Sequence, residues 1–274
     1  ERLGRLNIEG FLDSELIVME ALIGEEEWVV NSVSLHGIHK FLDMWYGPPK
    51  VCRSGGDGGP AQFLYTEQYL ALESQRRADV LEFCCKALDA LGLRNGAAHT
   101  ELLWTVDGPR LLEVNARASG GLPRAPGWPN QLEAMAMALF DKVKFAGLRR
   151  APDDSGVAQV GGGAAVVFLR SDIDGWMTRR ALQAIVDLRT FRRFERRLLG
   201  LEANNLRAVS VQRTVDLGTS PGSVVLHGRH ADVHADVAEI RRIEASGGYV
   251  AELSPEPPAK PPESEAPGPP RISV

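Results

Sequence analysis

Cysteine is scarce in this chain of 274 residues, which has only three copies. Cys84 and Cys85 are adjacent, and Cys52 is the only other cysteine. Adjacent cysteines rarely pair and the count is odd, so no disulfide framework is expected. A reducing, cytoplasmic compartment fits this usage. Cys84 is best interpreted as a small core residue on a helix, since no nucleophile motif surrounds it.

The chain also lacks a long hydrophobic run and an excess of positive charge. No apolar stretch approaches the roughly 20 residues of a membrane span, and the net charge of -5 gives no electrostatic attraction to nucleic acid. One basic run, RTFRRFERR at 189–197, favours nucleic acid, but a solvated helical or loop face explains it better. There is no signal peptide and the first residue is Glu1, so we expect a processed chain or a fragment.

Composition and patterning predict an α+β protein in three parts. With 44% hydrophobic and 24% charged residues, the chain has a composition typical of globular proteins. Residues 1–150 form the first predicted domain, 151–250 a smaller α+β extension, and 251–274 a tail. The tail is proline-dense and nearly free of apolar residues, so we expect it to be disordered.

Hydrophobic periodicity predicts the individual elements. Alternation favours strands, and spacing of three or four favours helices. His36-Gly37 suits a tight hairpin turn between two of the strands. The predicted strands are 16–23, 28–35, 38–45, 98–105, 110–117, 163–170, 206–215 and 222–227, and the predicted helices are 67–91, 130–145, 178–187 and 231–245.

The stretch LLEVNARASGG at 111–121 carries the clearest chemical signal. Alternate residues of a strand point to one face, so Glu113, Asn115 and Arg117 share a side. On the preceding strand, AAHTELLWT, His99 and Glu101 share a face by the same rule. If the two strands pair as a hairpin, the two glutamates can meet across it.

The hairpin turn decides whether Glu101 faces Glu113. A two-residue turn at Asp107-Gly108 would place Glu101 opposite Val114, on the wrong face. A three-residue loop, Val106-Asp107-Gly108, keeps the two carboxylates opposite each other. A bulge that restores the parity would do the same.

Two converging carboxylates repel unless a cation lies between them. Mg²⁺ takes oxygen ligands and binds through one or two carboxylates plus substrate phosphates. Asn115 adds a neutral oxygen, and Arg117 is suited to an anion beside the metal. A lone E-x-N-x-R would be a solvated hairpin face, but Glu101 and the Gly120-Gly121 pair favour a metal and phosphate site.

These residues resemble the ATP-grasp superfamily, in particular the C-terminal part of L-amino-acid (dipeptide) ligases and carnosine-synthase-like carboxylate-amine ligases. VMEALIGEEEWVVNSVSLHGIHKFLDMW is similar to the family's nucleotide hinge and following sheet. GLRNGAAHTELLWTVDGPRLLEVNARASGG is similar to its metal hairpin, and RTVDLGTSPGSVVL to a piece of the amino-acid ligases' extension. The similarity covers most of residues 1–250.

The resemblance implies a role for each matching residue. ATP and Mg²⁺, or Mn²⁺ in its place, would be the cofactors, and amino acids the substrates. Arg117 would be the catalytic residue that stabilises the transferring group. The metal ligands would be Glu101, Glu113 and Asn115; the nucleotide contacts Glu20, Ala21, Ile23 and Glu27; and the substrate contacts Arg117, Gly120, Gly121 and His99.

The resemblance also implies that parts of the enzyme are missing. The family's N-terminal domain and most of its central phosphate-binding subdomain do not fit into the few residues before the hinge. We therefore expect this chain to be the C-terminal half of an ATP-dependent ligase, inactive alone, with the missing half or a homodimer partner completing it. The alternative is a non-catalytic nucleotide-binding or interaction module derived from the same fold.

Overall fold

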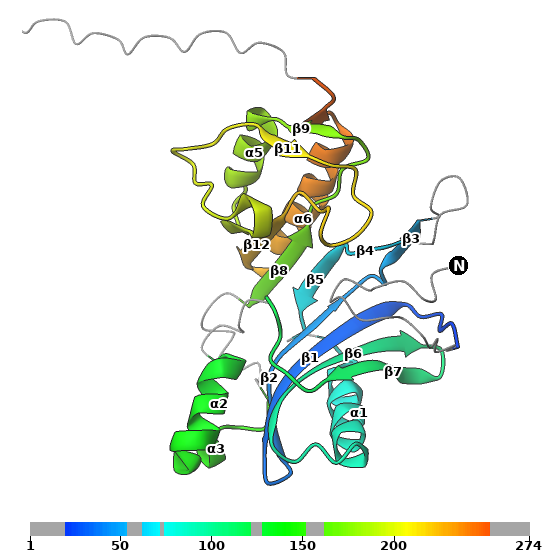
Figure 1. Cartoon of the computed structure of the whole chain (residues 1–274), viewed down its shortest axis with the longest axis vertical. Coiled ribbons are helices and arrows are strands. Elements are labelled where there is room, and N and C mark those ends of the chain that lie inside the picture. Colours follow the sequence, from blue (N-terminus) through cyan, green and yellow to red (C-terminus); the bar gives the residue numbers. More distant parts are fainter. Residues whose placement is uncertain (1–19, 54–61, 72–73, 122–127, 152–161, 253–274) are drawn as a thin grey trace, which may run out of the picture.

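The computed structural model describes residues 20–53, 62–71, 74–121, 128–151 and 162–252. Its main feature in these ranges is an eight-stranded sheet in which every pairing is antiparallel (Figure 1). In spatial order its strands are β10 (Phe191–Glu195), β12 (Ser223–Gly228), β8 (Gly163–Phe168), β5 (Glu67–Leu70), β2 (Ile38–Gly47), β1 (Glu26–Leu35), β6 (Gly96–Thr105) and β7 (Gly108–Asn115). The α+β prediction is confirmed, and the tail from residue 253 lies outside the described residues.

The β1–β2 hairpin forms as its sequence predicts. His36 and Gly37 both have positive φ, at 53° and 81°. Two consecutive positive φ values give a turn whose twist matches that of the flanking strands. Of the predicted strand 16–23, only the last residues are described, and they are not a strand. They are mostly exposed, and the first sheet hydrogen bond comes from the Glu25 amide to the Trp104 carbonyl at 2.8 Å.

One face of the sheet is covered by α1 (Arg77–Ala90). Its buried residues Val80, Cys84 and Leu88 recur every four positions and join the apolar cluster that includes Trp28. The predicted helix 67–91 begins ten residues too early, because residues 67–70 form β5. Hydrogen-bonding partners on both sides, β2 and β8, hold β5 in the sheet.

The opposite face is covered at one end by α2 (Gln131–Phe140) and α3 (Lys142–Gly147). The predicted helix 130–145 is two helices, because Asp141 leaves the helical conformation and its side chain caps α3 through the Lys144 amide. Asn130 and Glu133 form a reciprocal capping box at the start of α2. Ala134 and Ala138 then pack with Val33 on this face.

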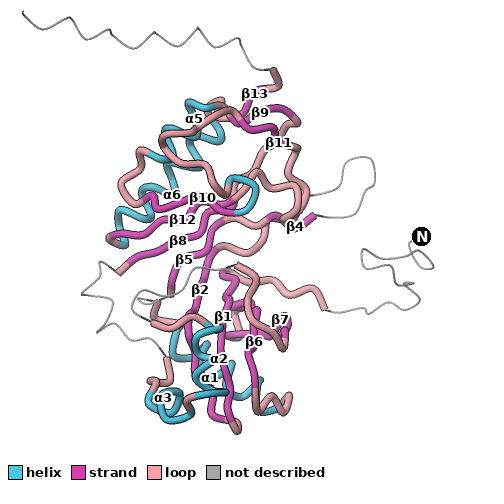
Figure 2. The backbone as a smooth tube through the Cα atoms, turned by 60° about the vertical axis from the view of Figure 1, so that its left-hand side comes forward, coloured by secondary structure: helices cyan, strands magenta, loops and turns pink. Residues whose placement is uncertain are grey.

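The C-terminal segment extends the same sheet across the boundary predicted near residue 150, so the division into domains stays a prediction. Figure 2 shows α5 (Arg179–Val186) and α6 (His230–Ala245) at one end of the sheet and α1, α2 and α3 at the other. The basic run 189–197 is mostly a strand, not the solvated helical or loop face that was predicted. It contains edge strand β10, whose Phe194 is buried, followed by the 3-10 turn η2 (Arg196–Leu198).

Two small sheets complete the described structure. One contains β11 (Val209–Val211), β9 (Gly175–Met177) and β13 (Tyr249–Val250), so the predicted strand 206–215 is much shorter than expected. The other pairs β3 (Val51–Arg53) with β4 (Gln62–Leu64). None of the helices in the described ranges combines the length and the apolar character that a membrane crossing needs.

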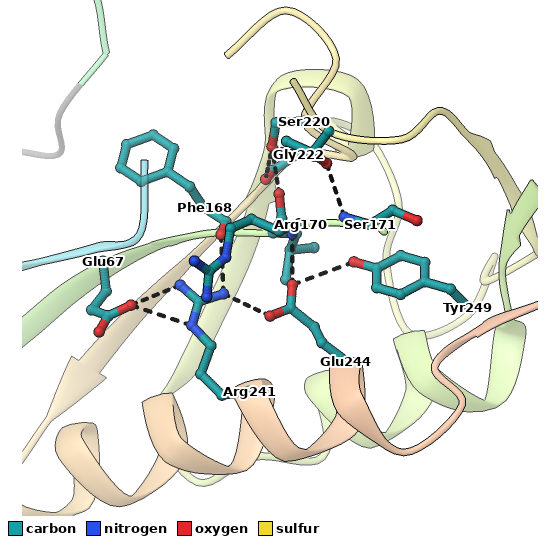
Figure 3. A network of polar contacts seen from close by, with 11 residues as sticks. Glu67, Phe168, Arg170, Ser171, Ser220, Gly222, Arg241, Glu244 and Tyr249 are labelled. Carbon is teal, nitrogen blue, oxygen red and sulfur yellow. Dashed lines mark hydrogen bonds and ion pairs between the residues drawn. The ribbon is translucent and has the colours of Figure 1, made fainter. Parts of the chain in front are cut away.

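A partly buried ion network fastens α6 to the centre of the large sheet (Figure 3). Arg241 on α6 contacts Glu67 of β5 at 2.7 Å and Glu244 at 2.6 Å. The other Glu244 oxygen accepts the Arg170 amide at 2.7 Å and the Tyr249 hydroxyl at 3.4 Å. Each carboxylate therefore has a cationic or hydrogen-bonding partner, as buried charges require.

Candidate functional site

The β6–β7 hairpin brings Glu101 and Glu113 together. They are direct cross-strand partners, and His99 and Asn115 form the next pair on the same face. The expected three-residue loop is wrong, because Thr105 pairs with Gly108 and leaves a two-residue turn. A register shift beyond Glu101 restores the parity, so the bulge alternative applies.

A row of polar side chains crosses four strands beside these carboxylates. Asp43 of β2 pairs with Asn31 of β1, Asn31 with His99 of β6, and His99 with Asn115 of β7. The Asn31 amide donates to Asp43 Oδ1 at 2.5 Å, and Asn31 Oδ1 lies 2.8 Å from His99 Nδ1. His99 Nε2 lies 3.3 Å from Glu101 Oε1, so a hydrogen-bonded chain leads from Asp43 to Glu101.

Lys50 lies between the carboxylates of Glu27 and Glu101, and the sequence analysis did not identify it. Its Nζ lies 2.9 Å from Glu27 Oε1 and 3.0 Å from Glu101 Oε2. Burial would lower the pKa of Lys50, but the two carboxylates outweigh burial and raise it above its usual value. Lys50 therefore stays charged and offsets the repulsion between Glu27 and Glu101.

The two glutamates beside Lys50 differ electrostatically. The hydrogen bond from His99, aided by the charge of Lys50, lowers the pKa of Glu101 to about 2. Glu101 is thus ionised at all physiological pH values. Burial raises the pKa of Glu27 despite its contact with Lys50. Of the pair, Glu101 is the better ligand for a metal ion, because metal ligands must be deprotonated.

Six of the predicted site residues line one pocket of about 260 Å³. They are His99, Glu101, Glu113, Arg117, Gly120 and Gly121. Asn115 lies beside them, and its amide donates to Glu113 Oε1 at 2.7 Å. The structure thus brings the predicted metal and substrate groups into a single concave site.

The loop that carries Gly120 and Gly121 is held against the sheet by Gln131 at the start of α2. Gln131 Oε1 accepts the Ser119 amide at 2.7 Å. Its Nε2 donates to the carbonyls of Ser32 and Ala98, at 3.0 Å and 2.9 Å. A Cβ built on either glycine would meet no atom within 4 Å, so both face open space where a ligand can approach the backbone.

The predicted nucleotide contacts are not gathered in this pocket. Glu20, Ala21 and Ile23 precede β1 as exposed residues, and the Ile23 side chain is 89% exposed. Glu27 is buried beside Lys50. Their contacts to adenine and ribose therefore stay predictions.

The donor set in the pocket fits Mg²⁺ or Mn²⁺. Glu101, Glu113 and Asn115 offer only oxygen ligands, from two carboxylates and an amide. Within the described ranges no group of three or more His, Cys, Asp and Glu side chains is arranged to hold a metal. A site of two glutamates and one asparagine depends on further oxygens from water or phosphate, as Mg²⁺ sites usually do.

Four functional candidates escaped the sequence analysis, and three of them had a weak signal. Asn31 and Asp43 are polar residues inside strands that otherwise read as buried, at positions that pair across a hairpin. Gln131 is the second residue after Pro129, at a predicted helix start. Lys50 had no usable signal, because its contact with Glu101 spans 51 residues of sequence.

Comparison with solved structures identifies the class of fold. The crystal structure of L-amino acid ligase from Bacillus licheniformis matches with a TM-score of 0.55 at 19% identity, over 81% of this chain and 53% of that one. Together with the sequence relative below, this match shows that the chain has the ATP-grasp fold and resembles the C-terminal part of the amino-acid ligases. No protein-family model matches the chain.

A curated relative comes from the sequence comparison. The chain is 28% identical over 251 residues to dapdiamide A synthase of Enterobacter agglomerans. The aligned region covers 89% of this chain and 54% of that protein. The chain thus spans about half the length of the relatives it matches. This coverage agrees with the expectation that the chain is one half of a longer ligase, which remains a proposal.

Proposed function

We propose that this chain is the metal- and acyl-group-binding half of an ATP-dependent carboxylate-amine ligase. The observation that carries the proposal is the pocket in which Glu101, Glu113 and Arg117 meet the Gly120–Gly121 loop. The similarity to a protein named dapdiamide A synthase and the fold of an L-amino acid ligase support it.

The proposed reaction has two steps. A carboxylate oxygen of an amino acid takes the terminal phosphoryl group of ATP, forming an acyl phosphate and ADP. An amine then attacks the acyl carbon, the amide bond forms, and phosphate leaves while the amine loses a proton. A divalent cation would neutralise phosphate charge during the transfer.

The residues of this chain would bind and orient the reacting groups. Glu101 and Glu113, with Asn115, would hold the cation. Arg117 would face the phosphoryl group and the later tetrahedral oxyanion, where a preorganised donor has its largest effect. Lys50 lies between Glu27 and Glu101 without a ligand present. A metal ion bound to Glu101 would take the place of Lys50 there, and the Lys50 ammonium would then be free to face a phosphate.

The proposal is tested by comparing this chain with a version extended at its N-terminus. Residues 1–274 alone should release no ADP with any amino-acid pair, because they carry only part of the phosphate-binding machinery. The extended protein should release ADP and phosphate when amino acids are added, and Glu113→Ala should abolish this release. Robust ligation by residues 1–274 alone would overturn the half-enzyme proposal.

A further inference from the structure

The pocket that holds Glu101 and Glu113 has a second wall, which the metal and phosphate groups do not explain. This wall comes from the C-terminal segment of the sheet, whereas the metal ligands come from the β6–β7 hairpin. Its lining residues are Val166, Phe168, Arg196, Leu217 and Ser223. The pocket, at about 260 Å³, is smaller than the roughly 300–1,000 Å³ of sites for drug-sized ligands. Groups on both walls can therefore contact one small molecule.

Arg196 is held in this second wall by a strained turn. Its φ is 61°, in the left-handed region that residues with a Cβ seldom adopt. Leu198 of the same turn, η2, is fully buried and packs closely against Gly222. A Cβ at Gly222 would lie 2.8 Å from Leu198 Cγ and 3.0 Å from the Glu195 carbonyl oxygen. The core thus imposes the strain, and strain of this kind is concentrated at ligand-binding sites.

The Arg196 guanidinium is oriented but not neutralised. Its Cζ lies 5.7 Å from the centroid of the Phe168 ring, within the range of a cation–π contact. Phe168 is itself buried and packs against Tyr65, with 5.3 Å between the ring centroids. Among the residues that the structure describes, no carboxylate forms an ion pair with Arg196, whereas Arg193 pairs with Glu195 at 2.7 Å. The guanidinium is therefore available to an anion that enters the pocket.

Ser223 adds a hydrogen-bonding group to the same wall. The residue is buried, and its Oγ has no hydrogen-bond partner in the described part of the chain. Ser223 pairs with Phe168 of β8 on one side and with Glu195, the residue before Arg196, on the other. A buried hydroxyl without a partner is costly. A carboxylate held by Arg196 would bring an acceptor to it.

We propose that Arg196 binds the carboxylate of the amine substrate, which is therefore a small amino acid. The inference rests on the proposed ligase function, because it assigns the second substrate of that reaction. A guanidinium pairs with a carboxylate through two parallel hydrogen bonds. Phe168 and Leu217 would contact an apolar side chain, since Leu217 packs against the apolar cluster that contains Phe168.

The position of Arg196 decides which carboxylate it binds. Arg196 belongs to the C-terminal wall, so a carboxylate held there is not the one beside Glu101 and Glu113 that receives the phosphoryl group. The amine of the same molecule lies in the same pocket as the acyl group, and no loop separates them. When this amine attacks the acyl carbon and phosphate leaves, the carboxylate at Arg196 is retained in the product.

The test compares L-valine with L-valinamide, which has the same apolar side chain but no carboxylate. Each is titrated into residues 1–274 at pH 7, and binding is followed by NMR. L-valine should bind about 10- to 100-fold more tightly, which is the effect of charge-assisted hydrogen bonds to its carboxylate. Equal affinities for the two probes would overturn the proposal.

Arg196→Asn removes the guanidinium and keeps the turn. Asn tolerates positive φ better than most residues, so the variant should fold. It should abolish the preference for L-valine and leave the affinity for L-valinamide unchanged. Arg197→Asn is the matched control, because Arg197 is the next residue and lines a different pocket. It should keep the preference. A preference for L-valine that persists in Arg196→Asn contradicts the assignment.

A second variant makes the test independent of the strained turn. Ser223→Ala removes only a hydroxyl that has no hydrogen-bond partner within the described residues, so the variant should fold. It should weaken the binding of L-valine by about 2- to 10-fold, the effect of one hydrogen bond, and leave L-valinamide unaffected. An affinity for L-valine equal to that of the wild type would count against a carboxylate on this wall.

Mn²⁺ binding, measured on the same samples, separates this inference from the proposed function. If Mn²⁺ fails to bind while the Arg196-dependent preference for L-valine holds, the metal site of the proposed ligase fails and the carboxylate site stands. If Mn²⁺ binds and the preference is absent, the ligase proposal stands and the Arg196 assignment fails.

Discussion

Lys50 Nζ lies 3.0 Å from Glu101 Oε2, on the side of the carboxylate away from His99, whose Nε2 lies 3.3 Å from Oε1. Each oxygen of Glu101 thus has its own nitrogen partner. This arrangement holds the carboxylate ionised and oriented before any ligand arrives. A carboxylate fixed in this way is preorganised to accept a metal ion in exchange for Lys50.

The ionisation of Glu101 predicts a specific pH dependence of stability. Its pKa falls from 4.5 in the unfolded reference to about 2 in the folded protein. The contribution is therefore fully present above pH 4.5 and is lost as pH falls toward 2, with a size on the order of 3 kcal/mol. Urea unfolding at several pH values should show this loss in the wild type and a shallower one in Glu101→Gln.

The control for that experiment is Glu82→Gln. Glu82 pairs with Lys86 on the exposed face of α1, where solvent screens the ion pair and little stability depends on it. The control should follow the wild-type curve closely. An identical acid profile in Glu101→Gln and the wild type would contradict the paired state of Glu101.

The Arg241 network predicts a stability effect far from the pocket. Arg241→Met leaves Glu67 without its partner and removes one of three contacts from Glu244. Breaking a fully buried pair costs about 3–5 kcal/mol, and these side chains are partly buried, so we expect a smaller loss than that. Denaturant unfolding should show this loss.

Arg242→Met is the matched control, one residue along the same helix. Arg242 pairs with Glu239 at the surface, where solvent screens the pair, so this variant should lose little stability. Equal losses in the two variants would show that the Glu67–Arg241–Glu244 network does not fasten α6 to the sheet.

The hydrogen bonds of Gln131 predict that α2 holds the Gly120–Gly121 loop in place. Gln131→Leu removes three hydrogen bonds and leaves the carbonyls of Ser32 and Ala98 without that donor. At about 0.5–1.5 kcal/mol per bond, we expect a loss of roughly 2–4 kcal/mol. Hydrogen exchange of the Ser119 amide should accelerate more than global unfolding explains, and an unchanged exchange rate would rule out the link.

The hairpin could be predicted from sequence because its signal is local. Glu113 and Asn115 alternate along one strand and Glu101 along its neighbour, so period-two geometry and a short turn fix their common face. The three-residue loop of the hairpin was wrong. A two-residue turn with a bulge and a three-residue loop both place Glu101 opposite Glu113. Sequence alone does not distinguish them, because both satisfy the same alternation.

The other parts of the site depend on long-range packing. Lys50 lies just after β2, and Glu101 lies on β6. The two meet because β2 and β6 flank β1 in the sheet. Strand β5 was included in the predicted helix 67–91, and its pairing with β2 and β8 on both sides makes it a strand. The Asp43–Asn31–His99 row becomes visible only once the register of three strands is known.

The most direct test of the central claim is Mn²⁺ binding to residues 1–274, followed by electron paramagnetic resonance with and without ADP. The account predicts saturable binding of one site that tightens with ADP. Glu113→Gln should weaken it by more than the roughly 10- to 100-fold that loss of an outer-shell partner costs, while Glu239→Gln, at the exposed Arg242 pair, should not change it. Mn²⁺ affinity that is the same in Glu113→Gln and the wild type would contradict a metal site at Glu101 and Glu113.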